Sequence, residues 1–377
     1  MKGIKLPPGP PKLPPIGNLH LLGNLCHCSL ENLSKKYNSI MLLQLGSAPT
    51  IDSSPRPNRF SYNGLDVLFS PYSDHWKEMR KVFISELLSM KRVQSFAYAR
   101  EDEVDKLITS LSQALPKPVN LNKKIFTLVD GIIGTVAFGK IYGTDQFKDQ
   151  VFHNVLGEAM NMLVSFSAED FFPRIGRIDA LTGLSDHARL KPEQEDFVDF
   201  LIRLMKDESN SFKVSENCMK AMLFDEFIDG IVTTSTTILW AMSELIKNPR
   251  VMNNTFRLHP PVPILPPREA MREFKVGEFD ILPKTRILVN VWAIGRDPNG
   301  PDFNLLPFGA GHRICPGLDM GATNVEFTLA NMLYWFHWEL PNDMKREDIS
   351  IEEEDGLACQ RRTPLWLVLI SNSSQVE

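Results

Sequence analysis

The stretch PFGAGHRICPG, residues 307–317, decides the fold class of this 377-residue chain. It places Cys315 in a glycine-rich loop directly before a run that is predicted to form a helix, because apolar residues recur at steps of three or four from Leu318 to Phe336. The backbone N–H groups and the dipole at a helix start favour a thiolate over a thiol, so Cys315 is a candidate metal ligand. Glycines in this loop would let the backbone pass close to a flat cofactor: Gly309, Gly311 and Gly317.

Five fixed positions of this loop match the pattern FxxGxRxCxG: Phe308, Gly311, Arg313, Cys315 and Gly317. On these residues the chain resembles the cytochrome P450 family. The resemblance implies a mainly α-helical fold with a small β region, here incomplete, and haem (heme, iron protoporphyrin IX) as the cofactor. It also implies that Cys315 is the proximal iron ligand, that Phe308 packs near the ring and that Arg313 meets a haem propionate. Taken without the resemblance, Cys315 could be a small structural cysteine on a turn.

Composition and charge limit the possible functions. The chain is 43% hydrophobic, with a net charge of −5 and a pI near 6.0, so it can bury a large core and lacks the basic surface of a nucleic-acid-binding protein. Its five cysteines are irregularly spaced, which argues against a disulfide framework. Cys26, His27 and Cys28 are adjacent, but the sequence shows no second ligand pair beside them, so no zinc site is predicted there.

A proline-rich segment, residues 1–18, precedes the predicted catalytic body. It reads LPPGPPKLPPIGNLH from Leu6 and favours polyproline II, which is compatible with a rigid linker or an SH3-type ligand. In the plant microsomal branch of the family, a similar string is the hinge after a membrane anchor. Residues 19–377 are then expected to form a single haem-binding domain. The sequence contains no apolar run of about eighteen residues or more, and none is predicted to span a membrane.

Outside this segment the chain is predicted to be mostly helical. A long apolar helix is expected from about Ser215 to Lys247. Residues 279–293, FDILPKTRILVNVWA, carry β-branched runs around a Pro-Lys turn and predict a β-hairpin. Helices beside a small sheet fit the α-dominated fold class.

Two further segments carry residues that the family uses to hold haem propionates. Trp76 and Arg80 are four residues apart, so they share one face of a predicted helix. Alone, this is an ordinary amphipathic surface. The resemblance implies that both side chains, with Arg268 of the PPRE string, contact propionates, a role that suits the permanently charged, forked guanidinium.

The predicted long helix contains DGIVTTSTT, a cluster of small and hydroxyl residues. One interpretation is helix packing, with hydroxyls bonded back to the preceding turn. The family instead has (A/G)Gx(D/E)T(T/S) here, and the resemblance implies catalytic roles for Thr233 and Thr234 in proton delivery. Val232 replaces the family's acid and can carry no proton, so Asp229, one turn earlier, is a candidate substitute.

Other motifs of the family are altered or missing. Arg257 occupies the arginine position of the ExxR motif, while Asn254 replaces the glutamate, and no PERF-like string precedes the haem loop. Such a network normally compensates a buried charge. Several joins, among them KNPRVMNNTFRLHPP and SDHARLKPEQED, lack segments found in family members, so the domain is expected to contain internal deletions.

The function implied by the resemblance is a haem-thiolate monooxygenase. It would insert one oxygen atom of O2 into a small lipophilic substrate, with electrons from an NADPH-dependent flavoprotein reductase. The expected setting is the cytosolic face of the endoplasmic reticulum, with peripheral membrane contact, or alternatively a soluble form, since the sequence shows no transmembrane anchor. No nucleic-acid partner is expected. Two alternatives remain open at this point: a non-catalytic or impaired haem-binding relic or splice product, and a haem-thiolate dehydratase or isomerase. The sequence does not identify the substrate.

Overall fold

The computed structural model describes residues 4–14, 17–45, 65–68, 70–139, 142, 196–206, 214–247, 255–297, 306–341, 344–354 and 358–371. Most of them are helical, as the fold class predicts. The α-helices are α1 (Cys26–Lys36), α2 (Asp74–Val82), α3 (Met90–Ser95), α4 (Ala97–Ser112), α5 (Leu121–Phe138), α8 (Phe197–Lys206), α9 (Glu216–Lys247), α10 (Thr255–Leu258), α11 (Val291–Arg296) and α12 (Leu318–Trp335). Shorter helical turns are η1 (Leu19–Leu21), η2 (Phe83–Leu87), η8 (Gly311–Arg313) and η9 (Arg346–Asp348).

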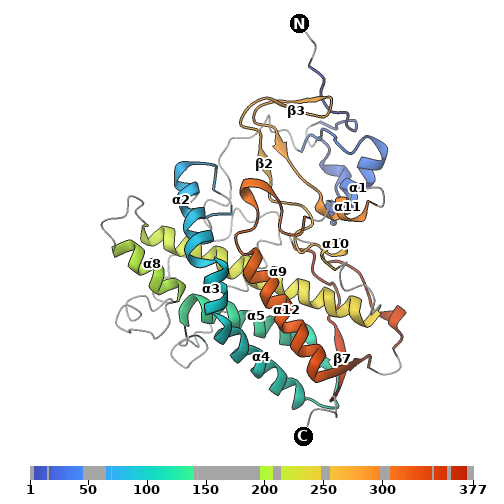
Figure 1. The fold of residues 1–377 in the computed structure, drawn as a ribbon. Helices are drawn as coiled ribbons and strands as arrows, with labels where there is room; N and C mark the ends of the chain where they lie inside the picture. Colours follow the sequence, from blue (N-terminus) through green and yellow to red (C-terminus); the bar gives the residue numbers. More distant parts are fainter. Residues whose placement is uncertain are drawn as a thin grey trace.

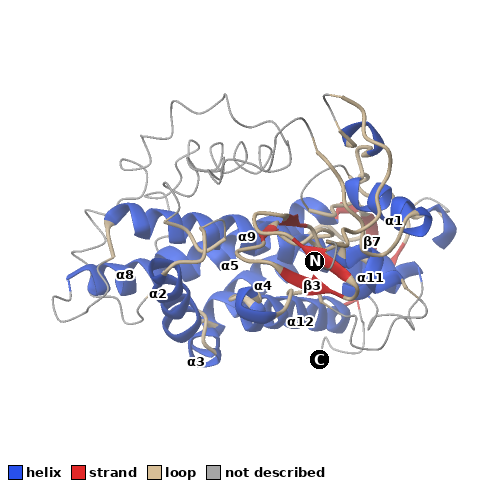
Figure 2. Ribbon diagram, turned by 90° about the horizontal axis from the view of Figure 1, so that it is seen from above, coloured by secondary structure: helices blue, strands red, loops and turns tan. Residues whose placement is uncertain are grey.

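The strands are short and form small antiparallel sheets. They are β1 (Val119–Asn120), β2 (Arg268–Glu269), β3 (Phe274–Val276), β4 (Phe279–Ile281), β5 (Arg286–Ile287), β6 (Phe336–Glu339) and β7 (Trp366–Ser371). In the described part of the chain, β1, β7 and β6 form one sheet in that order, while β2 pairs with β5 and β3 with β4. Figure 2 shows the strands toward the end of the molecule that holds α1 and α11, away from α8, α2 and α3.

The hairpin predicted for residues 279–293 is wrong in its pairing. Pro283 and Lys284 do form a turn, but the strands on either side pair elsewhere: β4 with β3, and β5 with β2. Gly277 adopts a φ of +59° in the tight connection between β3 and β4, a conformation that glycine takes without a steric cost. Residues 291–296 form α11 rather than a strand. The hairpin that does form is therefore set by Gly277, and the predicted turn instead joins two separate pairs.

Helix α9 forms the centre of the core and confirms the predicted long helix. It lies along α5, where Phe138 and Phe227 place their ring centroids 5.4 Å apart. A side chain at Gly230 would meet the Cδ1 atom of Ile133 at 3.0 Å, so this glycine allows the two helices to approach closely. Helices α4, α5, α9 and α12 lie side by side in the lower half of Figure 1, with α2 and α3 beside them.

The proline-rich segment is docked against the rest of the molecule. The backbone N–H of Leu42 donates to the Pro8 carbonyl at 2.8 Å, and the Asn18 side chain donates to the Pro11 carbonyl at 2.8 Å. A Cβ on Gly9 would lie only 2.0 Å from the Leu42 carbonyl oxygen, so glycine is required for this contact. Among the residues described, no helix combines the length and apolar character needed to cross a bilayer.

Candidate active site

The loop that carries Cys315 lies directly before α12, as predicted from the sequence. Gly309 and Gly311 adopt φ angles of +71° and +72°, which reverse the chain before η8. The Cys315 N–H then donates to the Phe308 carbonyl at 2.8 Å, and the loop passes through Gly317 into α12. Phe308 packs against Phe256 at 5.7 Å between centroids. The positive-φ glycines and this hydrogen bond fix the position of the Cys315 thiol.

The Cys315 side chain is exposed, although protein groups surround it on several sides. Desolvation raises its pKa to about 11, while the Gly317 N–H bonded to its sulfur acts in the opposite direction. The charges of Asp229 and Glu226 on α9 raise this pKa further, so α9 lies near the thiol. Without a metal the surroundings therefore favour the neutral thiol, because the protein groups that replace water near the sulfur outweigh one N–H donor. Coordination to a metal removes the thiol proton.

An arginine and tryptophan stack lies beside the loop. Trp76 on α2 is 2% exposed, and its indole N–H donates to the Val67 carbonyl at 2.9 Å. The guanidinium of Arg313 lies 4.3 Å from the centre of the indole ring, and that of Arg80 lies 5.5 Å from it. Arg80 also donates to the carbonyl of Ile314, the residue before the cysteine. The predicted WxxxR pair and the loop therefore form one cluster.

Arg268 completes a group of three cations around this site. Its charge lowers the pKa of both Arg80 and Arg313, although burial is the larger cause in each case. Within the described residues none of the three forms an ion pair with a carboxylate, although Asp66 acts on Arg313 through its charge. Like charges held together in this way favour an anionic ligand. The exposed thiol, the glycine loop and the cationic group together fit haem, whose propionates are anionic.

Helix α9 lies near this loop and carries the predicted threonines. Asp229 is exposed, Gly230, Val232 and Thr233 are half-buried, and Thr234 is buried in the packing. The Thr233 hydroxyl donates to the Asp229 carbonyl and that of Thr237 donates to the Thr233 carbonyl, so the back-bonding interpretation holds for these hydroxyls. Protein surroundings and the charge of Asp66 raise the pKa of the Asp229 carboxyl to about 7.

A set of buried carboxyl groups near the threonines of α9 was not predicted from the sequence. Asp225 accepts the Val67 N–H at 2.8 Å, and Asp66 accepts the Ser70 hydroxyl at 2.7 Å. Burial, followed by the charges of Asp66 and Asp229, raises the pKa of Asp225 well above its usual value. The only sequence signal is three carboxylates within five residues of an otherwise apolar helix: Asp225, Glu226 and Asp229.

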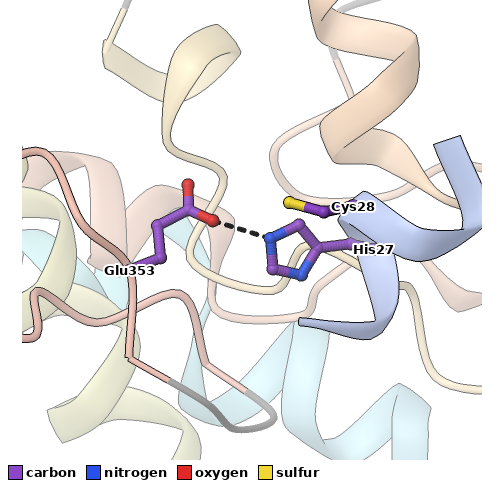
Figure 3. A group of neighbouring side chains, drawn as sticks. All are labelled: His27, Cys28 and Glu353. Carbon is purple, nitrogen blue, oxygen red and sulfur yellow. Dashed lines mark hydrogen bonds and ion pairs between the residues drawn. The ribbon is translucent and has the colours of Figure 1, made fainter. Parts of the chain in front are cut away.

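Two other predicted features lie apart from the thiol. Arg257 on α10 donates to the Gly295 carbonyl at 2.8 Å, while Asn254 lies outside the described residues. His27 and Cys28 of α1 lie next to Glu353, a grouping that the spacing of the sequence could not reveal (Figure 3).

Comparison with known proteins identifies the family. The family model described as Cytochrome P450 matches residues 52–183, 183–255 and 250–368, which together span most of the chain. The chain belongs to the cytochrome P450 family. This cytochrome P450 is 43% identical over 467 residues to 2-methylbutanal oxime monooxygenase of Manihot esculenta, with 97% of this chain and 91% of the relative covered.

Further relatives and a solved structure agree. 4-Hydroxyphenylacetaldehyde oxime monooxygenase of Sorghum bicolor is 41% identical over 468 residues, covering 97% of this chain and 88% of its own length. Cytochrome P450 71B34 of Arabidopsis thaliana is 40% identical, with 97% and 93% covered. A solved zebrafish cytochrome P450 with abiraterone has a TM-score of 0.74 at 19% identity, covers 92% of this chain and 99% of its own, and shows the shared fold.

These findings establish the reaction class. The protein is a haem-thiolate monooxygenase of the plant cytochrome P450 type, with haem as its cofactor. It therefore requires O2, an organic substrate and a redox partner. No finding favours the relic or the dehydratase alternative.

Proposed function

We propose that this cytochrome P450 is an aldoxime monooxygenase that acts on a small, lipophilic oxime. The observation that carries the proposal is its 43% identity, along 97% of its length, to a relative named for 2-methylbutanal oxime. A second relative, at 41% identity, is named for an aromatic aldoxime. The aliphatic and aromatic oximes share a C=N–OH group, and that group defines the proposed substrate class.

In this proposal haem is held by Cys315 at its iron and by the cationic cluster at its propionates. Cys315 supplies the sulfur ligand, oriented by the Phe308 carbonyl and the Gly317 N–H. Phe308, Gly309 and Gly317 would lie against the ring, and no atom lies closer than 3.9 Å to a Cβ added at either glycine. Bound haem supplies the redox chemistry, whereas the protein supplies position and charge.

The propionates are assigned to the cationic cluster. Arg80, Arg268 and Arg313 bring three positive charges together, and Trp76 supports two of them through its ring face. Two propionates would offset most of this repulsion. Arginine is suited to the task because its donors can fork onto a carboxylate.

On the α9 side, Thr233 is proposed to hold water in the site, and Thr234, which is buried, supports the helix behind it. The sequence motif gives both threonines catalytic roles, but only Thr233 has a partly exposed side chain here. Val232 cannot exchange a proton, whereas the carboxyl of Asp229 can, one turn earlier. Asp229 is the group to which we assign proton supply.

The domain organisation is proposed to be a hinge, residues 1–18, followed by a single haem domain, residues 19–377, with internal deletions. The alignment to the Manihot esculenta relative runs over 467 residues, although this chain has 377, so at least 90 positions of the relative have no counterpart here. The family match also breaks at 183 and near 250–255, at two of the joins noted in the sequence.

Peripheral contact with the cytosolic face of the endoplasmic reticulum membrane is proposed for the end that carries the N-terminal segment. Lys5 pairs with Asp280 of β4 through its backbone, so this segment lies beside the β3–β4 hairpin (Figure 1). Apolar side chains are exposed on the N-terminal segment and on or just before the β3–β4 hairpin, and positively charged side chains lie among them. The exposed apolar residues are Ile4, Leu6, Met271, Phe274 and Val276. An NADPH-dependent flavoprotein reductase bound to the same membrane would deliver the electrons.

Two experiments test the function. The haem-loaded chain, reduced and exposed to carbon monoxide, should show the Soret shift of thiolate ligation, and Cys315→Ala should abolish it. A conventional shift in the unaltered chain would overturn the ligand assignment. With a plant reductase and NADPH, the chain should consume 2-methylbutanal oxime or 4-hydroxyphenylacetaldehyde oxime. Normal thiolate ligation without turnover of any aldoxime would overturn only the substrate class.

A further inference from the structure

A cluster of metal-type ligands, with His27 and Glu353 buried and Cys28 half-buried, lies on elements other than those that hold Cys315. His27 and Cys28 come from the first turn of α1, and Glu353 comes from the segment between η9 and β7. The His27 Nε2 lies 2.6 Å from the Glu353 Oε2, and one donor atom from each of the three residues lies within 4.8 Å of the others. Figure 3 shows the imidazole, the thiol and the carboxylate converging from these two segments.

A fourth donor reaches the same carboxylate. The Cys359 thiol is buried and forms a hydrogen bond with Glu353. The charge of Cys28 also raises the pKa of the Cys359 thiol, so the two thiols are close enough to interact. His27, Cys28 and Glu353 supply three donors of the kind that zinc binds, and the Cys359 thiol, which is bonded to Glu353, is the candidate for the fourth position of a tetrahedral site.

The charge of this donor set is balanced by a neighbouring cation. Arg296 places its Nη2 3.6 Å from the Glu353 Oε1, and its guanidinium stacks 3.6 Å over the Trp292 ring. A doubly charged cation with two thiolates and one carboxylate carries one net negative charge, which Arg296 offsets. The cluster is equally neutral without metal, when both thiols keep their protons and Arg296 pairs with Glu353 alone.

Surrounding groups hold the ligands in place. The Trp292 indole N–H donates to the Glu353 Oε1 at 2.9 Å, and Asn290 donates to the His27 carbonyl at 2.7 Å. The Trp240 indole N–H donates to the Cys359 carbonyl at 2.7 Å. Such outer contacts orient metal ligands in established sites.

We propose that His27, Cys28, Glu353 and Cys359 form a structural zinc site that joins α1 to the C-terminal segment. Binding of the ion releases the protons of the two thiols to solvent, while His27 stays a neutral imidazole that carries its hydrogen on Nδ1 so that Nε2 can bind the ion. The sequence argument against zinc at Cys26–Cys28 depended on the absence of a second ligand pair. Glu353 and Cys359 supply that pair from the far end of the chain.

The test uses the haem-loaded chain, freed of metal by a chelator and then given zinc chloride. We expect one zinc ion per chain after desalting and a higher thermal unfolding temperature, because a ligand bound only by the folded state stabilises it. X-ray absorption at the zinc edge should show sulfur neighbours near ~2.3 Å and nitrogen or oxygen neighbours near ~2.0–2.1 Å. Haem iron does not contribute at that edge.

Matched variants separate the site from incidental binding. Cys28→Ser and Cys359→Ser should each weaken zinc binding by at least ~10-fold, whereas Cys26→Ser should not, since Cys26 instead points its thiol toward the Gly23 carbonyl. The proposal is overturned if the unaltered chain retains no zinc, if the absorption spectrum shows no sulfur neighbour, or if Cys26→Ser weakens binding as much as Cys28→Ser. The absorption measurement on the unaltered chain stands even if a variant does not fold.

Discussion

The hydroxyl of Thr233 donates a hydrogen bond to the backbone carbonyl of Asp229, one turn earlier on α9. This contact joins the residue proposed to hold water to the residue proposed to supply protons. The family's acid position, Val232, lies between them without a polar group. Under the proposed roles, proton supply to the site depends on a single turn of helix.

Replacement of Thr233 tests this relationship. Thr233→Ala should lower product formation by ~10²-fold at unchanged electron flow, because lost proton delivery diverts reduced oxygen to hydrogen peroxide. Thr233→Ser keeps the hydroxyl and should retain most of the yield. Product and peroxide per NADPH are the quantities to measure. Equal yields from the two variants would show that the hydroxyl is not involved.

Arg80 is expected to hold haem through its forked donors. Arg80→Ala should weaken haem binding by ~10–100-fold, the value of one charge-assisted hydrogen-bonded pair, and Arg80→Lys should restore only part of it. The rate of haem transfer to a scavenging apoprotein measures the change. Lys81→Ala, an exposed neighbour on α2, is the control. Similar transfer rates for Arg80→Ala and Lys81→Ala would contradict the assignment.

Glu226 predicts an unusual pH dependence of stability. Its side chain is 7% exposed, and burial followed by the charge of Asp229 raises its pKa to about 8. Between the unfolded pKa near 4.5 and this value the folded state binds more protons, so the free energy of unfolding falls as pH rises. Glu226→Gln should therefore stabilise the protein at pH 8 by on the order of a few kcal/mol, and not below the unfolded pKa.

Denaturant unfolding at both ends of this range checks the effect. The exposed Glu326→Gln on α12 should leave stability nearly unchanged at either pH. A gain from Glu226→Gln that is the same at low and high pH would point to packing rather than to charge.

Gly311 is expected to resist substitution because of its backbone. No atom lies within 4 Å of a Cβ added there, but its φ of +72° is costly for other residues. Gly311→Ala should lower stability by about 1–2 kcal/mol and loosen the loop before Cys315. Gly321→Ala, within α12, should maintain or raise the unfolding temperature. A neutral Gly311→Ala would mean that the loop adopts another conformation.

The sequence was most informative where one segment determines its own structure. The three-to-four-residue period predicted α12, a long apolar run predicted α9, and the four-residue spacing placed Trp76 and Arg80 on one helix face. The β4 and β5 partners were predicted wrongly, because the partner of a short strand depends on tertiary packing rather than on its own residues.

Features that join distant segments could not be read from the sequence. His27 and Glu353 are 326 residues apart, and the carboxyl group of Asp225 meets the N–H of Val67 across 158 residues. Side-chain periodicity carries no information about such contacts. The motif of the haem loop was recognisable because its residues are contiguous, whereas the carboxyl cluster near it was not.

The β1–β7 pairing has a consequence for how the chain acquires its fold during synthesis. Val119 of β1 finds its partner in Leu367, so this edge remains open until the ribosome has made the chain as far as β7. Contacts between distant segments form slowly, and unpaired strand edges favour aggregation while they wait. The yield of folded protein in a cell should therefore depend on chaperones that protect the early helices until the last strand is released.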